Sequence, residues 1–224
     1  MLGRHFHKNV QEIDVKLKIK FIPESIARLY LKSIELPVRF FTKLEIHPNF
    51  FTFLGLLLAI ISAVCLCLGK FLLAGFLILI GGTFDVIDGK VARATGRGSK
   101  FGALFDSTLD RYSEVFLFFG LGFFFVRNGM YVSSLITFVA LGGSMMVSYV
   151  RARSEGLGFQ CKIGIMQRQE RIVYLGFGSM FSGISFLKYF PIIAVIWLIA
   201  FFANLTSIQR IYFVWQQAKK GETP

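Results

Sequence analysis

Four aspartates stand in an otherwise apolar part of the chain, as two pairs: Asp85 with Asp88, and Asp106 with Asp110. Spacings of three and four residues place the two members of a pair on one face of a helix. A carboxylate near a membrane core is costly, so such residues usually face a cavity and mark a functional site. Four converging carboxylates repel one another unless cations lie among them. Because oxygen ligands suit Mg²⁺ or Mn²⁺, and two such ions would neutralise four charges, we expect a metal site.

The composition indicates what kind of fold must position these side chains. The chain has 224 residues, 54% of them hydrophobic, and its mean hydropathy is +0.62, which is too apolar for an ordinary soluble domain. We predict an all-α integral membrane protein with six transmembrane helices, each near the length that crosses a hydrocarbon core of about 30 Å. The second and fifth are short, which predicts tilt or an extension beyond the membrane. The predicted spans are Phe50–Leu68, Phe71–Val86, Phe101–Val126, Tyr131–Val150, Ile172–Leu187 and Phe190–Phe213.

The basic residues predict the orientation of these spans. They gather before the first span, after the second and fourth, and at the end of the chain, whereas the other connections contain only Lys70, Arg127 and Lys188. By the positive-inside rule, both termini and the aspartates face the cytoplasm. The net charge of +12 then reflects topology and attraction to anionic lipid. Nucleic-acid binding is the other common use of such a charge, but no readout motif is present, so we expect no nucleic-acid partner.

The segment before the first span has its own pattern. From Pro23 to Leu44, apolar residues recur at helical spacing with basic residues between them. This pattern predicts an amphipathic helix in the cytoplasmic membrane interface, bent at Pro37; an ordinary solvated helix packed on the core is the alternative. We therefore expect a cytoplasmic arm with an interfacial helix (1–46), one membrane domain (47–215) and a cytoplasmic tail (216–224).

The aspartates also belong to a longer pattern. Eight specified residues at fixed spacings make it far more specific than a lone glycine motif. It resembles the signature of the CDP-alcohol phosphatidyltransferases at every fixed position. Members of that family transfer a phosphatidyl group from CDP-diacylglycerol to an alcohol and release CMP. The pattern reads Asp85-x2-Asp88-Gly89-x2-Ala92-Arg93-x8-Gly102-x3-Asp106-x3-Asp110.

The resemblance implies a role for each residue of the pattern. Asp85, Asp88 and Asp106 would bind Mg²⁺ or Mn²⁺, with two ions expected. Asp110 would be the general base that removes the acceptor proton, with a further contact to a metal. The residues implied to contact the CDP group are Asn49, Thr52, Asp88, Gly89, Ala92, Arg93 and Gly102.

Several of these implied CDP contacts have a simpler alternative. Asn49 and Thr52 open the first span, where capping of the helix would explain them equally well. Gly89 and Gly102 could serve the close packing of helices instead of a ligand. Arg93 offers a planar fork that suits phosphate oxygens.

Basic residues at the cytoplasmic ends of spans four and five suggest the nature of the acceptor. Positive-inside topology alone would place some of them there. However, a neutral alcohol would not require their density, whereas a phosphorylated polyol with about two negative charges would. The residues predicted to bind the acceptor phosphate are Arg153, Lys162, Arg168, Arg171 and Arg210.

The same region resembles the branch of the family that transfers to inositol phosphate, the phosphatidylinositol-phosphate synthases and their archaeal counterparts. Those carry Arg-Ala-Arg-x-Glu near the end of span four, as this chain does from Arg151 to Glu155. They also carry Arg-Pro-Glu-Arg at span five, where this chain has Gln169 in place of proline. A phosphatidylglycerophosphate synthase using glycerol 3-phosphate is the alternative. The resemblance further implies a homodimer in the inner or plasma membrane of a prokaryote.

A membrane cation transporter is the competing class, because transporters also use intramembrane aspartates. A transporter needs access from both sides, but these aspartates gather at one edge of the membrane and no polar trail crosses it. Release of CMP from CDP-diacylglycerol would distinguish the two classes.

Glu114 continues the stripe of Asp106 and Asp110 by one more turn. For Glu114 we predict a buried ion pair with a basic residue rather than a catalytic role.

Overall fold

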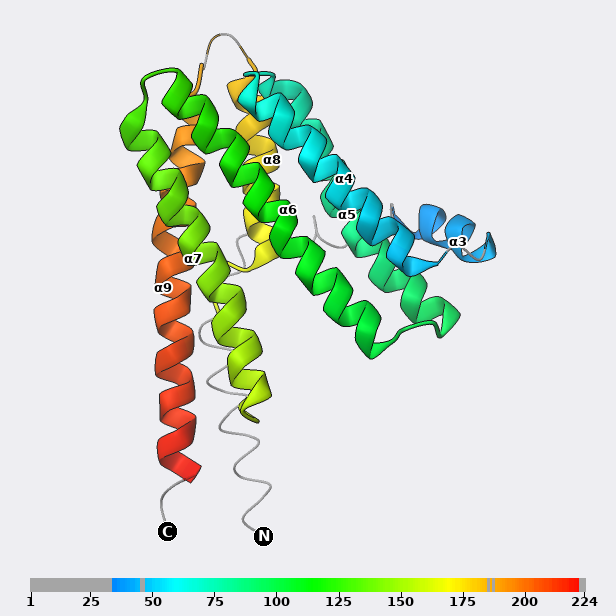
Figure 1. Cartoon of the computed structure of the whole chain (residues 1–224). Helices are drawn as coiled ribbons and strands as arrows, with labels where there is room; N and C mark the ends of the chain where they lie inside the picture. The colour runs from blue at the N-terminus through cyan, green and yellow to red at the C-terminus, as the bar shows by residue number, and fades with distance from the viewer. Residues whose placement is uncertain (1–33, 45–46, 185, 187, 222–224) are drawn as a thin grey trace.

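The computed structural model of the chain describes residues 34–44, 47–184, 186 and 188–221. Within these residues the protein consists of seven helices, and no strand occurs among them (Figure 1). The predicted all-α fold is therefore confirmed. The helices are α3 (Glu35–Lys43), α4 (Pro48–Cys67), α5 (Phe71–Thr95), α6 (Lys100–Arg127), α7 (Tyr131–Gly156), α8 (Arg168–Ser182) and α9 (Phe190–Gly221).

Each predicted span corresponds to one helix from α4 to α9. By length and composition, α4, α5, α7 and α9 can cross a membrane. α6 has 28 residues but carries Asp110, Arg111 and Glu114 within its apolar part, and α8 has only 15 residues. Four spans are thus supported, and the count of six stays a prediction. Large apolar side chains such as Phe76 and Trp197 are about half exposed, as an integral membrane protein requires on its lipid-facing side.

Two helices are longer than the predicted spans. α5 continues past Val86 to Thr95, where Gly96 ends it in the left-handed conformation with φ 65°. Glycine adopts that conformation without steric cost. This is the extension expected for the short second span, and it adds a turn that carries part of the predicted site. α9 likewise continues to Gly221 and so includes most of the segment predicted as a tail.

α8 is shifted along the chain relative to its predicted span. It begins at Arg168, before the predicted start at Ile172. The reason is a capping box, in which the side chains of Gln167 and Glu170 bond reciprocally to the main chain at the start of the helix. α8 ends at Ser182, several residues before the end of the predicted span. The earlier start brings two basic residues into the first turn of the helix.

α3 is the end of the predicted amphipathic helix; the rest of that helix and the arm before it lie outside the described residues. Pro37 lies in the first turn of α3, where a missing N–H is tolerated. Because the residues before Ile34 lie outside the described part, the bend at Pro37 stays a prediction. Val38 and Phe41 pack against a small apolar cluster of α4 and α5, whereas Leu36 and Phe40 are exposed. One side of α3 is therefore packed and the other is exposed, and its position in the membrane interface stays a prediction.

Consecutive helices run in opposite directions, so their connections alternate between the two ends of the bundle (Figure 1). The α4–α5 and α6–α7 connections lie at the upper end in that view, and the α5–α6 connection and the end of α9 lie toward the lower end. α4 packs on α5 and α6, α5 packs on α8, and α7 packs on α9. This arrangement gathers the polar ends of α5, α6 and α8 on one side of the core.

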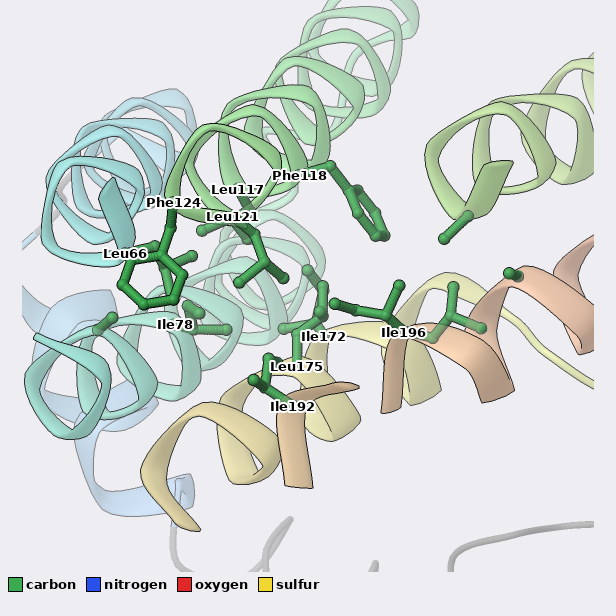
Figure 2. Packing of buried hydrophobic residues seen from close by; sticks show 14 of the residues in the cluster. Leu66, Ile78, Leu117, Phe118, Leu121, Phe124, Ile172, Leu175, Ile192 and Ile196 are labelled. Atoms are coloured by element: carbon green, nitrogen blue, oxygen red, sulfur yellow. The ribbon is translucent and has the colours of Figure 1, made fainter. Parts of the chain in front are cut away.

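A large apolar core joins these helices. Figure 2 shows side chains of α4, α5, α6, α8 and α9 that meet there. Each is almost fully buried, as in Leu66 of α4, Leu121 of α6 and Ile196 of α9. The core therefore fixes the relative positions of the helices that carry the polar residues.

Glycines allow some of these helices to approach at main-chain distance. A Cβ at Gly75 of α5 would lie 2.5 Å from the carbonyl oxygen of Gly176 of α8. A Cβ at Gly120 of α6 would fall against the main chain of Ala63 of α4. Such contacts between small residues are the usual means of close packing between membrane helices. They leave little freedom for α5, α6 and α8 to shift relative to one another.

Candidate active site

A tight turn brings the two aspartate pairs together. Asp85 and Asp88 lie in the last part of α5, and Asp106 lies in the second turn of α6. Gly96 ends α5, and the Ser99 side chain caps α6 by accepting a hydrogen bond from the Gly102 N–H at 2.9 Å. Because the two helices are antiparallel neighbours along the chain, their acidic faces meet as the sequence predicts.

Three of the four aspartates form a group that fits a metal ion. Carboxylate oxygens of Asp85, Asp88 and Asp106 all lie within 4.8 Å of one another. Asp88 is 6% exposed. Asp106 Oδ1 is buried and has no hydrogen-bond partner among the described residues, which would be costly for a carboxylate without a cation beside it. Three oxygen donors of this type suit Mg²⁺ or Mn²⁺.

Thr52 of α4 hydrogen-bonds to one carboxylate of this group. Its hydroxyl donates to Asp88 Oδ2 at 2.9 Å, and the residue is 7% exposed. The structure therefore places Thr52 against a carboxylate, where it orients a ligand oxygen. Capping of α4 is not its role, because the His47 side chain is the cap: His47 Nδ1 accepts from the Asn49 N–H at 3.2 Å.

Asn49 and Gly102 are neighbours across α4 and α6. A Cβ at Gly102 would lie 3.5 Å from Asn49 Oδ1 and 3.1 Å from Ser99 Oγ. Gly102 thus leaves room for the cap of its own helix and for Asn49. Close helix packing does not explain Gly89, since the atoms near its Cβ position belong to the Arg93 side chain, at 3.5 Å or more. Contact of these residues and of Ala92 with CDP stays a prediction.

Arg168 of α8 lies among the aspartates. Its Nη1 donates to Asp85 Oδ2 at 2.6 Å, and its Nη2 lies 2.7 Å from Asp110 Oδ1. All three side chains are partly buried, with 17–22% of their surface exposed. Asp110 is therefore linked to the three-carboxylate group through Arg168 and Asp85. Sequence reasoning placed Arg168 near the acceptor but missed its contact with both aspartates.

Arg171 is one turn further along α8 and fully buried. Its Nε and Nη2 donate to the two oxygens of Glu114, each at 2.9 Å, and its Nη1 reaches the Met166 carbonyl at 3.4 Å. The predicted buried ion pair of Glu114 is confirmed, with Arg171 as its partner. The predicted contact of Arg171 with an acceptor phosphate does not agree with this position, because its donors are already bonded and no surface is exposed.

Arg210 of α9 is also buried, at 2% exposure. Its Nε donates to the Ile163 carbonyl at 2.7 Å, and its Nη1 donates to the Val147 carbonyl. Thr206, one turn earlier, accepts from the Met166 N–H at 3.0 Å. α9 therefore holds the connection between α7 and α8 by its main chain. This disagrees with the predicted role of Arg210 as a ligand of the acceptor phosphate.

The remaining residues predicted for the acceptor phosphate are accessible. Arg153 lies in the last turn of α7 and Lys162 in the following connection, and both are exposed. The structure thus separates the five predicted cations into two exposed ones, two buried structural ones, and Arg168 among the carboxylates.

A small pocket between α4, α5, α6 and α8 is lined by Asp85 and Asp110. Its polar lining includes Thr52, Ser113 and Arg168, and the remainder is mainly apolar. The space open to water-sized molecules is about 30 Å³, room for roughly two waters. Sequence patterns gave no signal for it, because it depends on how closely α8 approaches α5.

Comparison with known proteins identifies the family. The sequence model of the CDP-alcohol phosphatidyltransferases matches residues 45–218. The chain belongs to this family. The predicted family is therefore confirmed, and the chain is a CDP-alcohol phosphatidyltransferase.

Two relatives indicate which members of the family this CDP-alcohol phosphatidyltransferase is similar to. It is 38% identical to the archaetidylinositol phosphate synthase of Pyrococcus horikoshii over 178 residues, which cover 79% of this chain and 86% of the relative. It is 31% identical to the phosphatidylinositol phosphate synthase of Mycobacterium tuberculosis over 196 residues, which cover 85% and 89%.

Solved structures agree with these relatives. The crystal structure of the Mycobacterium tuberculosis phosphatidylinositol phosphate synthase with CDP-DAG bound is similar to this chain with a TM-score of 0.73 and 28% identity, covering 80% of this chain and 91% of that one. A structure of the same synthase in complex with manganese and citrate has a TM-score of 0.70 at 28% identity, covering 80% and 87%. The fold is thus similar to that of a phosphatidylinositol phosphate synthase whose crystal structure contains manganese.

Proposed function

We propose that this phosphatidyltransferase transfers a phosphatidyl group from CDP-diacylglycerol to a hydroxyl of inositol phosphate and releases CMP. The observation that carries the acceptor is the similarity to two synthases of inositol-phosphate lipids, each over more than three quarters of this chain. The carboxylate group and the exposed cations Arg153 and Lys162 supply the matching chemistry. Glycerol 3-phosphate, the alternative acceptor, is not favoured by these relatives, and a cation transporter does not fit the family.

Asp85, Asp88 and Asp106 would hold the divalent ions, Mg²⁺ or Mn²⁺, with Thr52 fixing Asp88 in place. Bound ions lower the charge of the diphosphate and stabilise CMP as it leaves. The residues that would contact the CDP group lie on the same helices as these carboxylates or on α4: Asn49, Thr52, Asp88, Gly89, Ala92, Arg93 and Gly102.

Asp110 would take the proton of the acceptor hydroxyl. As that oxygen forms its bond to the phosphorus that carries diacylglycerol, the bond from this phosphorus to the oxygen of CMP breaks. CMP leaves with the electron pair of the broken bond, and Asp110 later returns its proton to water. Arg153, Lys162 and Arg168 would bind the acceptor phosphate, since cationic side chains with several donors suit phosphate oxygens.

We further infer that all six helices from α4 to α9 cross the membrane, with the site and both termini in the cytoplasm. Two observations support this orientation. Consecutive helices alternate in direction, and the basic connections follow α5 and α7 at one end of the bundle (Figure 1). A homodimer in the plasma or inner membrane of a prokaryote is proposed from the family alone.

The proposed reaction is tested by CMP release from purified protein in lipid vesicles that contain CDP-diacylglycerol and Mn²⁺. Inositol phosphate, glycerol 3-phosphate, free inositol and serine are offered separately. We expect turnover with inositol phosphate. Turnover confined to glycerol 3-phosphate or to a neutral alcohol would reassign the acceptor, and no CMP with any of the four would contradict the proposed reaction.

A further inference from the structure

The Arg168 guanidinium lies between the carboxylates assigned to the metal and to the acceptor proton. It joins Asp85 of α5 at 2.6 Å to Asp110 of α6 at 2.7 Å. We propose that Arg168 competes with a divalent cation for Asp85, and that it leaves both aspartates when the cation binds. The inference rests on the proposed function for the acceptor step, but the competition itself needs no acceptor.

Electrostatic repulsion opposes the presence of a divalent cation and the Arg168 guanidinium on Asp85 at the same time. A Mg²⁺ or Mn²⁺ ion binds a carboxylate oxygen at about 2.1 Å, so an ion on Asp85 Oδ2 would lie within about 5 Å of Arg168 Nη1. Like charges at that distance repel appreciably in a partly buried site, where water screens them poorly. Asp85 is 19% exposed and Arg168 is 22% exposed, so the repulsion is only partly screened.

The hydrogen bonding of Arg168 also indicates a second position. Its Nε is buried and has no partner among the described residues. A buried donor of a charged group without a partner costs free energy. Arg171, one turn later, differs in that its Nε, Nη1 and Nη2 all have partners. Arg168 is therefore incompletely satisfied where it lies, as expected of a side chain that can leave.

The main-chain position of Arg168 is nevertheless fixed. The buried pair of Arg171 with Glu114 holds the first turn of α8 on α6, and the capping box of Gln167 and Glu170 fixes the start of the helix. The guanidinium can therefore move by rotation of its own side chain while α8 stays in place. Arg171 and Glu114 are positioning residues for Arg168.

Departure of Arg168 would prepare the site for the acceptor. While Arg168 contacts Asp85 and Asp110, its guanidinium is not free to bind the acceptor phosphate. Once released, Asp110 can accept the hydroxyl proton and the guanidinium can bind the acceptor phosphate. Metal loading would thus precede productive binding of the acceptor.

The test is Mn²⁺ binding to the full chain in detergent without either substrate, measured from the EPR signal of free Mn²⁺. Arg168→Gln should bind Mn²⁺ about tenfold more tightly than the unmodified protein, the lower end of what residues around a metal site contribute. Arg151→Gln is the matched control, because Arg151 pairs with Glu155 on the surface of α7, and it should bind as the unmodified protein does. Equal or weaker binding by Arg168→Gln, or equal tightening by both variants, would overturn the proposal.

A second measurement needs no variant. Reaction of Arg168 with phenylglyoxal, read by peptide mass spectrometry, should rise several-fold when Mn²⁺ is added, while Arg171 stays unmodified. Unchanged or lower reactivity of Arg168 would overturn the proposal. Neither measurement contains CDP-diacylglycerol or an acceptor, so its failure is distinct from failure of the proposed reaction in the CMP assay.

Discussion

Glu114 of α6 and Arg171 of α8 form a two-pronged ion pair with no exposed surface on either side chain. One turn toward the connection between α5 and α6, Asp110 and Arg168 repeat the contact between the same two helices, but partly exposed. The inner pair, Glu114 with Arg171, links α8 to α6. The outer pair, Asp110 with Arg168, lies at the site, where its charges are available to ions and substrates.

Removing one charge of the inner pair should destabilise the protein strongly. Glu114→Gln leaves the Arg171 guanidinium buried without a compensating charge, a change that typically costs about 3–5 kcal/mol. We expect a clear fall in Tm of the detergent-solubilised protein. Glu155→Gln is the control, because it breaks an exposed pair with Arg151 and such pairs contribute little. Equal small shifts in both variants would contradict the structural role of the inner pair.

Thr52 should influence metal affinity without touching the metal. Thr52→Val removes the hydroxyl that orients Asp88 Oδ2, and we expect about tenfold weaker Mn²⁺ binding. Thr52→Ser keeps the hydroxyl and should retain most of the affinity. Ser62→Ala serves as control, since Ser62 is buried on the same helix but bonds to the Leu58 carbonyl. Unchanged Mn²⁺ binding in Thr52→Val would show that Asp88 does not depend on Thr52.

Two adjacent glycines of α7 should respond differently to alanine. A Cβ at Gly143 would lie 2.5 Å from Asn204 Nδ2 and 3.0 Å from the Asn204 main-chain nitrogen, whereas nothing lies within 4 Å of a Cβ at Gly142. Gly143→Ala should therefore overpack the contact of α7 with α9, at a cost of about 1–3 kcal/mol. Gly142→Ala should leave Tm unchanged or raise it, because alanine favours helix. Thermal unfolding checks both, and a larger loss in Gly142→Ala would contradict the packing.

Arg210 should hold the connection between α7 and α8. In Arg210→Met the carbonyls of Ile163 and Val147 lose their donor, so we expect trypsin to cleave after Lys162 several-fold faster. The same variant should raise KM for the acceptor more than it lowers kcat. If Arg210 only bound the acceptor, KM would rise while cleavage after Lys162 stayed as in the unmodified protein.

The sequence was sufficient for the carboxylate group because its geometry is local. Asp85 and Asp88 lie on one face of α5, and Asp106 lies near the start of α6. Because the turn between the two helices is short, the three carboxylates have few ways to lie far apart. The six helices followed from hydropathy for a similar reason. The ends of the helices were harder to predict. The start of α8, for example, depends on the capping box around Glu170 rather than on apolar residues.

The roles of the basic residues could not be assigned from sequence. Arg153, Arg171 and Arg210 are all close to ends of predicted spans where basic residues gather, and nothing in their spacing separates an exposed arginine from a buried one. Burial of Arg171 depends on how α8 packs on α5 and α9, which places Arg171 against Glu114 of α6, 57 positions away in the chain. The contact of Arg168 with both aspartates depends on the same packing.

The most direct test of the account is metal-dependent CMP release from CDP-diacylglycerol and inositol phosphate by the unmodified protein and by Asp110→Asn, with Mn²⁺ binding measured on both. The account predicts CMP release that requires Mg²⁺ or Mn²⁺. It also predicts a loss of at least about 100-fold in Asp110→Asn, which should still bind Mn²⁺ through Asp85, Asp88 and Asp106. Release of CMP without metal, or a rate in Asp110→Asn equal to that of the unmodified protein, would contradict it.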